Sequence, residues 1–133
     1  HLTFGWYFDK EYNVPSNVKY LNFYCKNKHI LNSLPNSVVE LKLRTSYIFS
    51  SSYENKITID NLPTSIKKLV IDDCYNNIIE HLNCLPNYIE ELHLSKSYKN
   101  RIFNIPHNLK KLKCNKDYPY KDDFAMCRIE FYE

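Results

Sequence analysis

Glycine is almost absent from this chain of 133 residues, and Gly5 is the single example. Phosphate-cradling loops such as G-x-x-x-x-G-K-[ST] and G-x-G-x-x-G need several glycines, so both classes of nucleotide-binding loop are excluded. No apolar run approaches the roughly 18 residues of a membrane-spanning helix, so we expect no membrane partner. Neither sign of charge dominates, because the net charge is +3 and basic and acidic residues are interleaved. That pattern argues against a dedicated nucleic-acid binder, which concentrates its positive charge.

The sequence also has no C-x-x-C pair, although it contains five cysteines. They are Cys25, Cys74, Cys84, Cys114 and Cys127. An odd number without that spacing, in a chain with an ordinary share of apolar residues, predicts reduced and mostly buried thiols rather than a disulfide framework. We therefore expect a reducing, cytoplasmic location.

What the sequence does contain is a repeat. The pattern apolar–Pro–x–x–apolar–x–x–Leu–x–apolar occurs five times, in copies that begin at Val14, Leu34, Leu62, Leu85 and Ile105. The prolines of these copies are 20, 28, 23 and 20 residues apart. Periods of this length are typical of solenoid proteins, in which each repeat forms one structural unit.

The repeats run through the whole chain, so we predict a single repeat domain, residues 1–133. Leu2 and Phe4 belong to a partial first copy, and Ile129 and Phe131 belong to a final segment that we expect to be a capping strand. The boundaries are 1–13 for the partial copy, 14–33, 34–61, 62–84, 85–104 and 105–118 for the full copies, and 119–133 for the cap.

A second recurring position, which we call the aromatic register, lies twelve residues after each proline. It is occupied by Asn27, Tyr47, Tyr75, Tyr98 and Tyr118. The four tyrosines predict a column of packed rings. Copy length varies only after this position, so the longest variable segment, 48–61, is predicted to be a tolerated surface loop. An extra outer strand at its K-I-T-I run, or a binding element, is the alternative.

The Leu-x-apolar end of the repeated pattern predicts a short strand in each copy. Apolar residues two positions apart share one face of a strand, and parallel stacking of the copies buries that face. The chain must run back from the end of each strand to the start of the next copy, and we call these segments the returns. Returns as short as six residues leave no room for a substantial helix, so we expect extended or 3₁₀ segments there. The predicted fold is mainly β: a short, leucine-rich-repeat-like parallel-β solenoid with about seven short strands stacked in one sheet. The predicted inward columns are Val18/Val38/Ile66/Ile89/Leu109, Leu2/Leu21/Leu41/Leu69/Leu92/Leu112/Ile129 and Phe4/Phe23/Leu43/Ile71/Leu94/Cys114/Phe131.

The motif F-N-I-P stands literally at Phe103–Pro106, and the other copies keep its apolar–Pro pair and the Leu-x-apolar end. From His1 to about Tyr118 the chain resembles the FNIP-repeat family, a relative of leucine-rich repeats. The resemblance implies repeat arrays found mainly in amoebal and giant-virus proteins, sometimes behind an F-box, and no established catalytic residues. No F-box-like segment is visible in this sequence. The Asn or Cys ladder of leucine-rich repeats is also missing, since only Cys74 fits it.

The outward side chains of the predicted strands form the candidate partner face, because solenoids bind along such extended faces. The candidate residues are Tyr20, Asn22, Tyr24, Glu40, Lys42, Arg44, Lys68, Val70, Asp72, Glu91, His93, Lys111 and Lys113. The alternative is a solvated face on which opposite charges alternate between neighbouring strands.

A lysine cluster in the last full copy is the one candidate for nucleic-acid contact. It consists of Lys110, Lys111, Lys113 and Lys116. Glu90 and Glu91 lie one coil away and weaken its field, so a charged edge that discourages aggregation is the favoured interpretation.

Catalytic and metal-binding patterns are weak. His81 and Cys84 form an H-x-x-C pair, with Cys74 and His93 nearby, but zinc needs about four converging ligands. Strand phase turns Cys74 inward and His93 outward, so we expect no metal or cofactor. Adjacent carboxylates such as Asp72 and Asp73 point to opposite faces of a strand, which is the wrong geometry for acid–base partners.

These observations predict a non-catalytic repeat module for protein–protein interaction. Two alternatives stay open: a structural component of a large assembly such as a viral particle, and the substrate-receptor part of an F-box ubiquitin ligase whose F-box lies outside this segment. The start at His1 rather than Met and the incomplete first copy fit the assembly alternative. In that case the location becomes the inside of a particle assembled in the cytoplasm.

Overall fold

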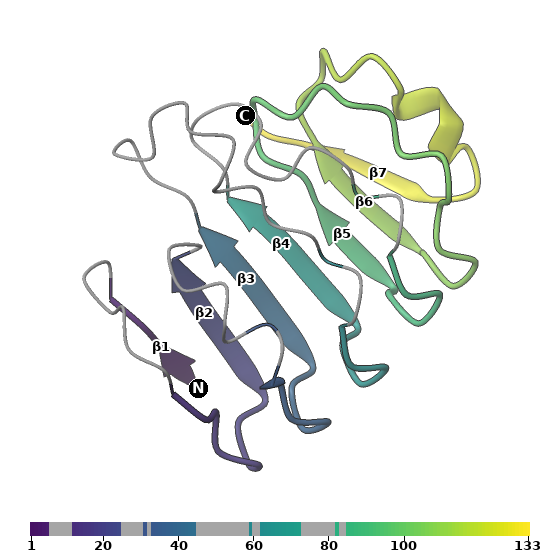
Figure 1. Cartoon of the computed structure of the whole chain (residues 1–133). Helices are drawn as coiled ribbons and strands as arrows, with labels where there is room; N and C mark the ends of the chain where they lie inside the picture. The colour runs from purple at the N-terminus through teal and green to yellow at the C-terminus, as the bar shows by residue number, and fades with distance from the viewer. Residues whose placement is uncertain are drawn as a thin grey trace.

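The computed structural model describes residues 1–5, 12–24, 31, 33–44, 59, 62–72, 82 and 85–133. In these residues the chain forms a parallel-β solenoid with a single seven-stranded sheet, whose strands follow each other in chain order (Figure 1). The strands are β1 (Leu2–Thr3), β2 (Tyr20–Tyr24), β3 (Glu40–Arg44), β4 (Lys68–Asp72), β5 (Glu91–His93), β6 (Lys111–Cys114) and β7 (Arg128–Phe131). A 3₁₀ helix, η3 (Lys121–Phe124), precedes β7. The predicted fold class is therefore confirmed.

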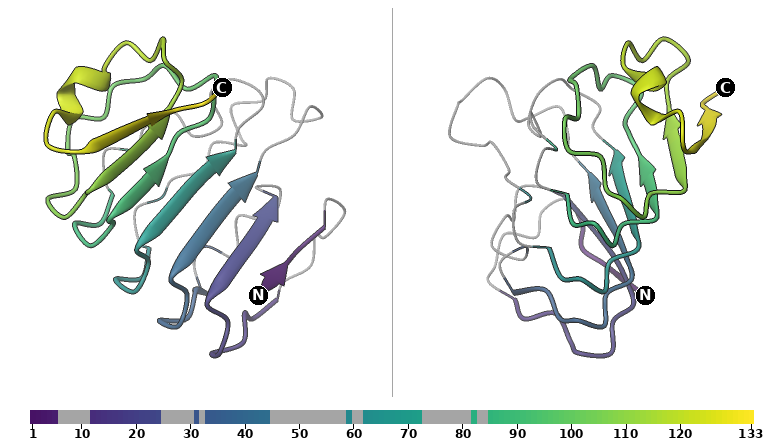
Figure 2. Two further views of the ribbon diagram at one scale, coloured as in Figure 1. Left: turned by 180° about the vertical axis from the view of Figure 1, so that it is seen from behind. Right: turned by 90° about the vertical axis from the view of Figure 1, so that its right-hand side faces the viewer.

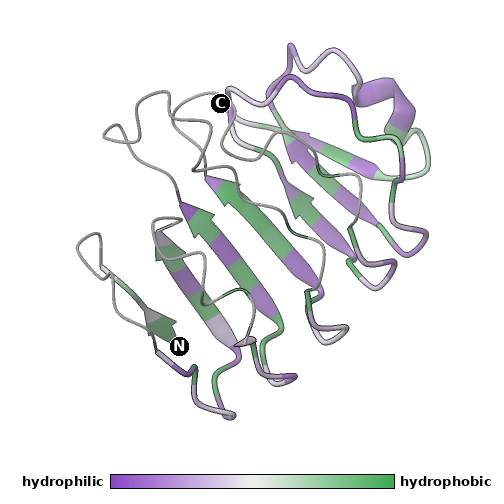
Figure 3. Ribbon diagram, in the orientation of Figure 1, coloured by the Kyte–Doolittle hydropathy of each residue, from purple (hydrophilic) through white to green (hydrophobic). Residues whose placement is uncertain are grey.

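The strands pair in the register that the repeat predicts. Leu69 of β4 lies opposite Leu92 of β5, and Leu92 lies opposite Leu112 of β6. All three side chains are fully buried. Along the central strands, hydrophobic and hydrophilic residues alternate (Figure 3), because successive side chains point to opposite faces. The described return segments lie on one side of the sheet, as the turned views show (Figure 2).

A proline turn leads into β2–β6 in every full copy. The carbonyl of the proline accepts a hydrogen bond from the amide three residues later, as in Pro63 and Ile66 at 3.1 Å. The same bond joins Pro15 to Val18, Pro35 to Val38, Pro86 to Ile89 and Pro106 to Leu109, at 3.1–3.2 Å. Proline needs no amide partner and restricts the residue before it to extended conformations, which suits a corner that leads into a strand.

The core contains a column that the sequence analysis did not identify. It consists of Leu31, Ile59, Leu82 and Ile102, each three residues before the apolar residue that precedes a repeat proline. All four are buried, with exposed fractions of 8, 4, 1 and 1%. This column fills the core from the return side, opposite the inward residues of the strands.

The predicted aromatic column can be followed at two positions. Tyr98 and Tyr118 are buried, and their ring centroids lie 6.1 Å apart. Burial raises the pKa of Tyr98 to about 12. Asn27, Tyr47 and Tyr75 lie outside the described residues, as does the 48–61 insertion except for the buried Ile59.

One predicted core position is wrong. Phe131 keeps its register opposite Cys114, but its side chain is 48% exposed. The neighbouring Ile129 and, at the other end of the sheet, Leu2 are only partly buried. A residue of a solenoid core is covered by the coils on both sides. Among the described residues no coil stacks beyond β7, so Phe131 has cover from one side only.

Residues 119–127 close this end with a 3₁₀ helix, unlike the return at 99–104, which the structure describes throughout and which has no helix. Phe124 of η3 is buried, and its ring lies 6.4 Å from that of Tyr118. The Tyr118 hydroxyl donates a hydrogen bond to the Asn100 carbonyl at 2.8 Å. The Arg101 guanidinium makes two hydrogen bonds to Asp123, at 2.8 and 3.2 Å, which tie η3 to the previous return.

Candidate functional site

The strand side chains that point away from the core form the outward face of the sheet. The structure brings all the candidate residues of the sequence onto this face, and each is half-buried or exposed. Strand register arranges them in rows. The first row is Tyr20, Glu40, Lys68, Glu91, Lys111 and Arg128; the second is Asn22, Lys42, Val70, His93, Lys113 and Glu130; the third is Tyr24, Arg44 and Asp72, continued at the same repeat position by Ser95, Asn115 and Tyr132.

Opposite charges alternate along the first row. Lys68 Nζ lies 3.5 Å from Glu40 Oε1. Lys111 Nζ lies 3.2 Å from Glu91 Oε1 and 3.1 Å from Glu130 Oε2. Hydrogen bonds to Glu130 and Glu91 raise the pKa of Lys111, and the bond from Lys111 lowers the pKa of Glu130. The carboxylates of Glu91 and Glu130, whose pKa values are both lowered, are therefore ionised at neutral pH and hold Lys111 in place.

The charge balance is different on β3 and β4. Asp72 Oδ2 lies 3.3 Å from Lys42 Nζ and 3.5 Å from Arg44 Nε. One carboxylate thus serves two cations, and positive charge remains in excess. The Arg44 guanidinium also lies over the Tyr24 ring, 5.1 Å from its centroid, in a cation–π contact.

His93 is a neutral side chain within this charged face. Burial lowers the pKa of His93, although its hydrogen bond with Glu91 opposes the change. Burial would raise the pKa of Glu91, but the hydrogen bonds from His93 and Lys111 prevail and lower it. At neutral pH the imidazole therefore donates its Nε2–H to the Glu91 carboxylate and adds no charge.

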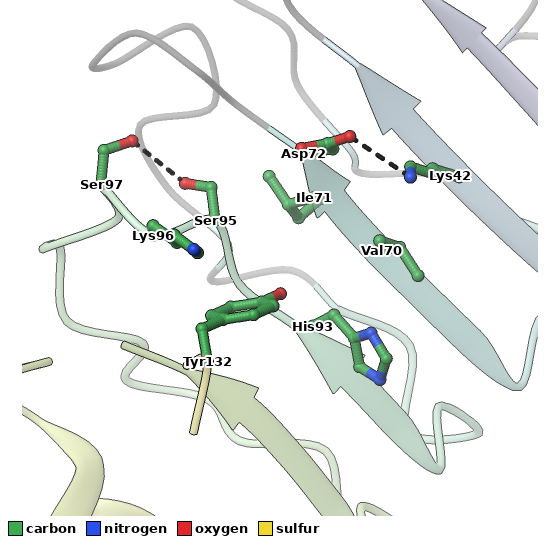
Figure 4. A pocket seen from close by; sticks show the side chains of 9 residues that line it. All are labelled: Lys42, Val70, Ile71, Asp72, His93, Ser95, Lys96, Ser97 and Tyr132. Carbon is green, nitrogen blue, oxygen red and sulfur yellow. Dashed lines mark hydrogen bonds and ion pairs between the residues drawn. The ribbon is translucent and has the colours of Figure 1, made fainter. Parts of the chain in front are cut away.

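A pocket of about 450 Å³ opens on the outward face at β4 and β5 (Figure 4). We call it the β4–β5 pocket. It is lined by Lys42, Val70, Ile71, Asp72, His93, Ser95, Lys96, Ser97 and Tyr132. Ser95 is 6% exposed, and its hydroxyl lies 3.3 Å from that of Ser97.

Tyr132 forms one wall of the β4–β5 pocket from the last coil (Figure 4). Its backbone amide continues the ladder by donating to the Cys114 carbonyl at 3.2 Å. Lys96 Nζ and Lys113 Nζ lie 5.8 and 4.9 Å from its ring centroid. Burial raises the pKa of the Tyr132 phenol, so the hydroxyl stays protonated at neutral pH.

A second hollow, of about 460 Å³, lies at the β2 end of the same face. It is lined by His1, Tyr20, Leu21, Asn22, Glu40 and Lys42. The buried Oδ1 of Asn22 accepts no hydrogen bond from the described residues. The His1 and Tyr20 rings are stacked, with centroids 6.2 Å apart. The outward face is thus hollowed at two places that share Lys42.

The other candidate sites gain no support. Lys110 pairs with Glu90 at 2.7 Å and Lys111 with Glu91, so much of the lysine cluster is neutralised. No group of three or more His, Cys, Asp or Glu side chains that could hold a metal occurs among the described residues, which omit Cys74, His81 and Cys84. Burial raises the pKa of both Cys114 and Cys127, which disfavours the reactive thiolate. No helix in the described part is long and apolar enough to cross a membrane.

The FNIP repeat model matches residues 11–46 and 53–97, which is more than half of the chain. The chain belongs to the FNIP-repeat family. The literal F-N-I-P at Phe103–Pro106 lies beyond the matched ranges, and the structure shows that its copy has the same turn and strand as the others. Searches of curated proteins and of solved structures find no match to the chain.

Several residues of the β4–β5 pocket were missing from the candidates of the sequence. Lys96 and Ser97 lie just beyond the third row, and Tyr132 lies within the predicted cap, 119–133, but was not among the candidate residues. Ser95 stands three residues after Leu92 and one after Leu94, at the position of Asp72 in the preceding copy, so the repeat pattern alone places it on this face. Tyr132 follows Phe131 in the same way, so the register alone would have added it.

Proposed function

We propose that this FNIP-repeat chain is a non-catalytic module that binds another protein through its outward face. The observation that carries the proposal is the pair of hollows, because a face evolved only for solubility has no need of them. Val70 and Tyr132 supply apolar surface within one of these hollows. Extended sheet faces of this kind are the surfaces that solenoids offer to partners.

A photo-crosslinker tests the proposal. Tyr20, on the outward face, and Tyr88, in a proline turn, are 48% and 45% exposed. Each is replaced in a separate variant by p-benzoylphenylalanine, which is close to tyrosine in shape. After irradiation in lysate of the source cells, we expect a discrete protein adduct from position 20 and none from position 88. Adducts of equal yield from both positions would contradict binding through this face.

The same experiment addresses the assembly alternative. Phe131, in β7, and Met126, just before it, are 48% and 96% exposed, and the outer edge of β7 is unpaired in the described part of the chain. Open, apolar edges of a sheet promote edge-to-edge association. A crosslinker at position 131 that joins two copies of this chain, with no adduct from position 20, would favour a structural building block over an interaction module.

A further inference from the structure

We propose that the β4–β5 pocket binds an apolar side chain of a partner segment that is acidic on both sides of that side chain. This inference rests on the proposed function and specifies its ligand chemistry. The partner is a peptide whose aliphatic or aromatic residue lies inside the pocket and whose carboxylates contact the surrounding cations.

The floor and wall of the pocket supply apolar surface. Val70 occupies the second outward row between Lys42 and His93, and it is the one aliphatic residue of that row in the described strands. His93 beside it is neutral at pH 7, because burial lowers its pKa. The Tyr132 ring stands opposite (Figure 4). A pocket of about 450 Å³ with this lining has room for one side chain of leucine or tryptophan size.

The rim of the pocket is positive. Lys42 and Lys96 line it, and Arg44 and Lys113 contact its wall residues Asp72 and Tyr132. Among the described lining residues Asp72 is the one carboxylate, and it is already shared by Lys42 and Arg44. Charge complementarity therefore selects carboxylates at the rim.

The polar atoms at the end of the pocket suit a peptide backbone. The Ser95 and Ser97 hydroxyls lie next to each other at 3.3 Å, and either one can donate or accept. A peptide amide or carbonyl that enters the pocket would thus find a partner. Groups of this kind fix the orientation of a ligand, while the apolar lining contributes most of the affinity.

The face does not suit nucleic acid. A phosphate backbone carries one negative charge per nucleotide and needs a continuous row of cations. The first outward row alternates in sign from Glu40 to Lys111, and its carboxylates Glu40 and Glu91 would repel phosphates on the side of the pocket toward the strand starts. Glu130 of the second row would do the same at β7. A peptide can place its carboxylates at chosen positions, whereas a nucleic acid cannot.

Fluorescence anisotropy with defined peptides tests the proposal. The probes are fluorescein-labelled heptapeptides, Gly-Glu-Glu-X-Glu-Glu-Gly, in which X is tryptophan, leucine or alanine, together with a series in which glutamine replaces every glutamate. We expect the tryptophan or leucine peptide to bind about 10-fold or more tightly than the alanine peptide, as an apolar pocket discriminates by this factor. The glutamine series should bind several-fold more weakly, and added salt should remove that difference.

Two pairs of variants locate the binding. Lys96 and Lys116 occupy the same position in consecutive copies, but only Lys96 lines the pocket. Lys96→Glu should therefore weaken binding of the tryptophan peptide at least about 5-fold, and Lys116→Glu less than 2-fold. Val70→Glu should abolish the preference for tryptophan over alanine, while Val39→Glu, at an exposed valine outside the pocket, should keep it. The four variants should keep the circular dichroism spectrum of the unmodified chain.

The proposal is overturned if the tryptophan and alanine peptides bind equally, if Lys96→Glu and Lys116→Glu weaken binding equally, or if an oligonucleotide of similar charge binds as tightly. A partner adduct from position 20 combined with any of these outcomes would leave the interaction module standing and reject only the pocket. Absence of both the adduct and peptide binding would reject the module as well.

Discussion

At the scale of single residues, Ile102 and Phe103 are chain neighbours in opposite environments. Ile102 is 1% exposed, whereas Phe103 is 69% exposed and lies with its ring centroid 5.5 Å from the Arg101 guanidinium. The conspicuous aromatic residue of the F-N-I-P motif is therefore a surface residue. The core contribution comes from the isoleucine before it, which belongs to the column that the repeat pattern left out.

We therefore predict that Ile102→Ala lowers the free energy of unfolding by about 2–5 kcal/mol, because it leaves a cavity in the packed core. Phe103→Ala should cost less than about 1 kcal/mol, the range of an exposed cation–π contact. Urea unfolding followed by circular dichroism measures both values. If Phe103→Ala proves the more damaging of the two, the assignment of this core column is wrong.

The Ile102 column was missed for a definable reason. The repeat was counted forward from each proline, and the segment after the aromatic register varies from six to fourteen residues. Counted backward from the next proline, Leu31, Ile59, Leu82 and Ile102 fall at one constant position. The column keeps a constant distance from the corner that follows it, so the differences in length between copies fall before it in the sequence.

At the scale of elements, side chains of the turns join successive coils. The Ser37 hydroxyl donates to the Val18 carbonyl at 2.7 Å, and the Ser65 hydroxyl donates to the Val38 carbonyl at the same distance. In the last coil the Cys127 thiol donates to the Leu109 carbonyl at 3.3 Å. Each donor satisfies the carbonyl of an inward turn residue that lies two residues before the strand of the preceding coil, so stacking is held by hydrogen bonds as well as by apolar contacts.

We expect Ser65→Ala to lower the free energy of unfolding by about 1–3 kcal/mol, since the Val38 carbonyl loses its donor in a partly buried place. Thr64→Ala, at the exposed neighbouring position, is the matched control and should change it by less than about 0.5 kcal/mol. Thermal and urea unfolding of the two variants give the comparison. Equal values would mean that the bond to Val38 adds nothing to the stacking of coils.

The strands and turns were the most predictable elements. Leu-x-apolar spacing fixes which residues face inward, and returns of this length exclude helical crossovers, so parallel stacking in register was the one way to bury the apolar residues. The β4–β5 pocket was less predictable. Its lining combines residues of the three strands β3, β4 and β5 with residues beyond the strands. The register alone places Ser95 and Tyr132 on this face, but a repeat pattern contains no information on how Lys96 and Ser97 fold beside it.

At the scale of the whole molecule, stability should vary along the solenoid, because each coil contacts only its neighbours. Phe4 and Leu94 donate equivalent backbone hydrogen bonds to the next strand, at 2.9 Å to Asn22 and 2.8 Å to Lys113. Phe4 follows the two-residue strand β1 at the end of the sheet, whereas Leu94 follows β5 in its interior. Native-state hydrogen exchange by NMR should therefore show the Phe4 amide exchanging at least about 100-fold faster than that of Leu94, through local opening of β1. Equal protection of the two amides would instead identify the solenoid as one cooperative unit that opens only by global unfolding.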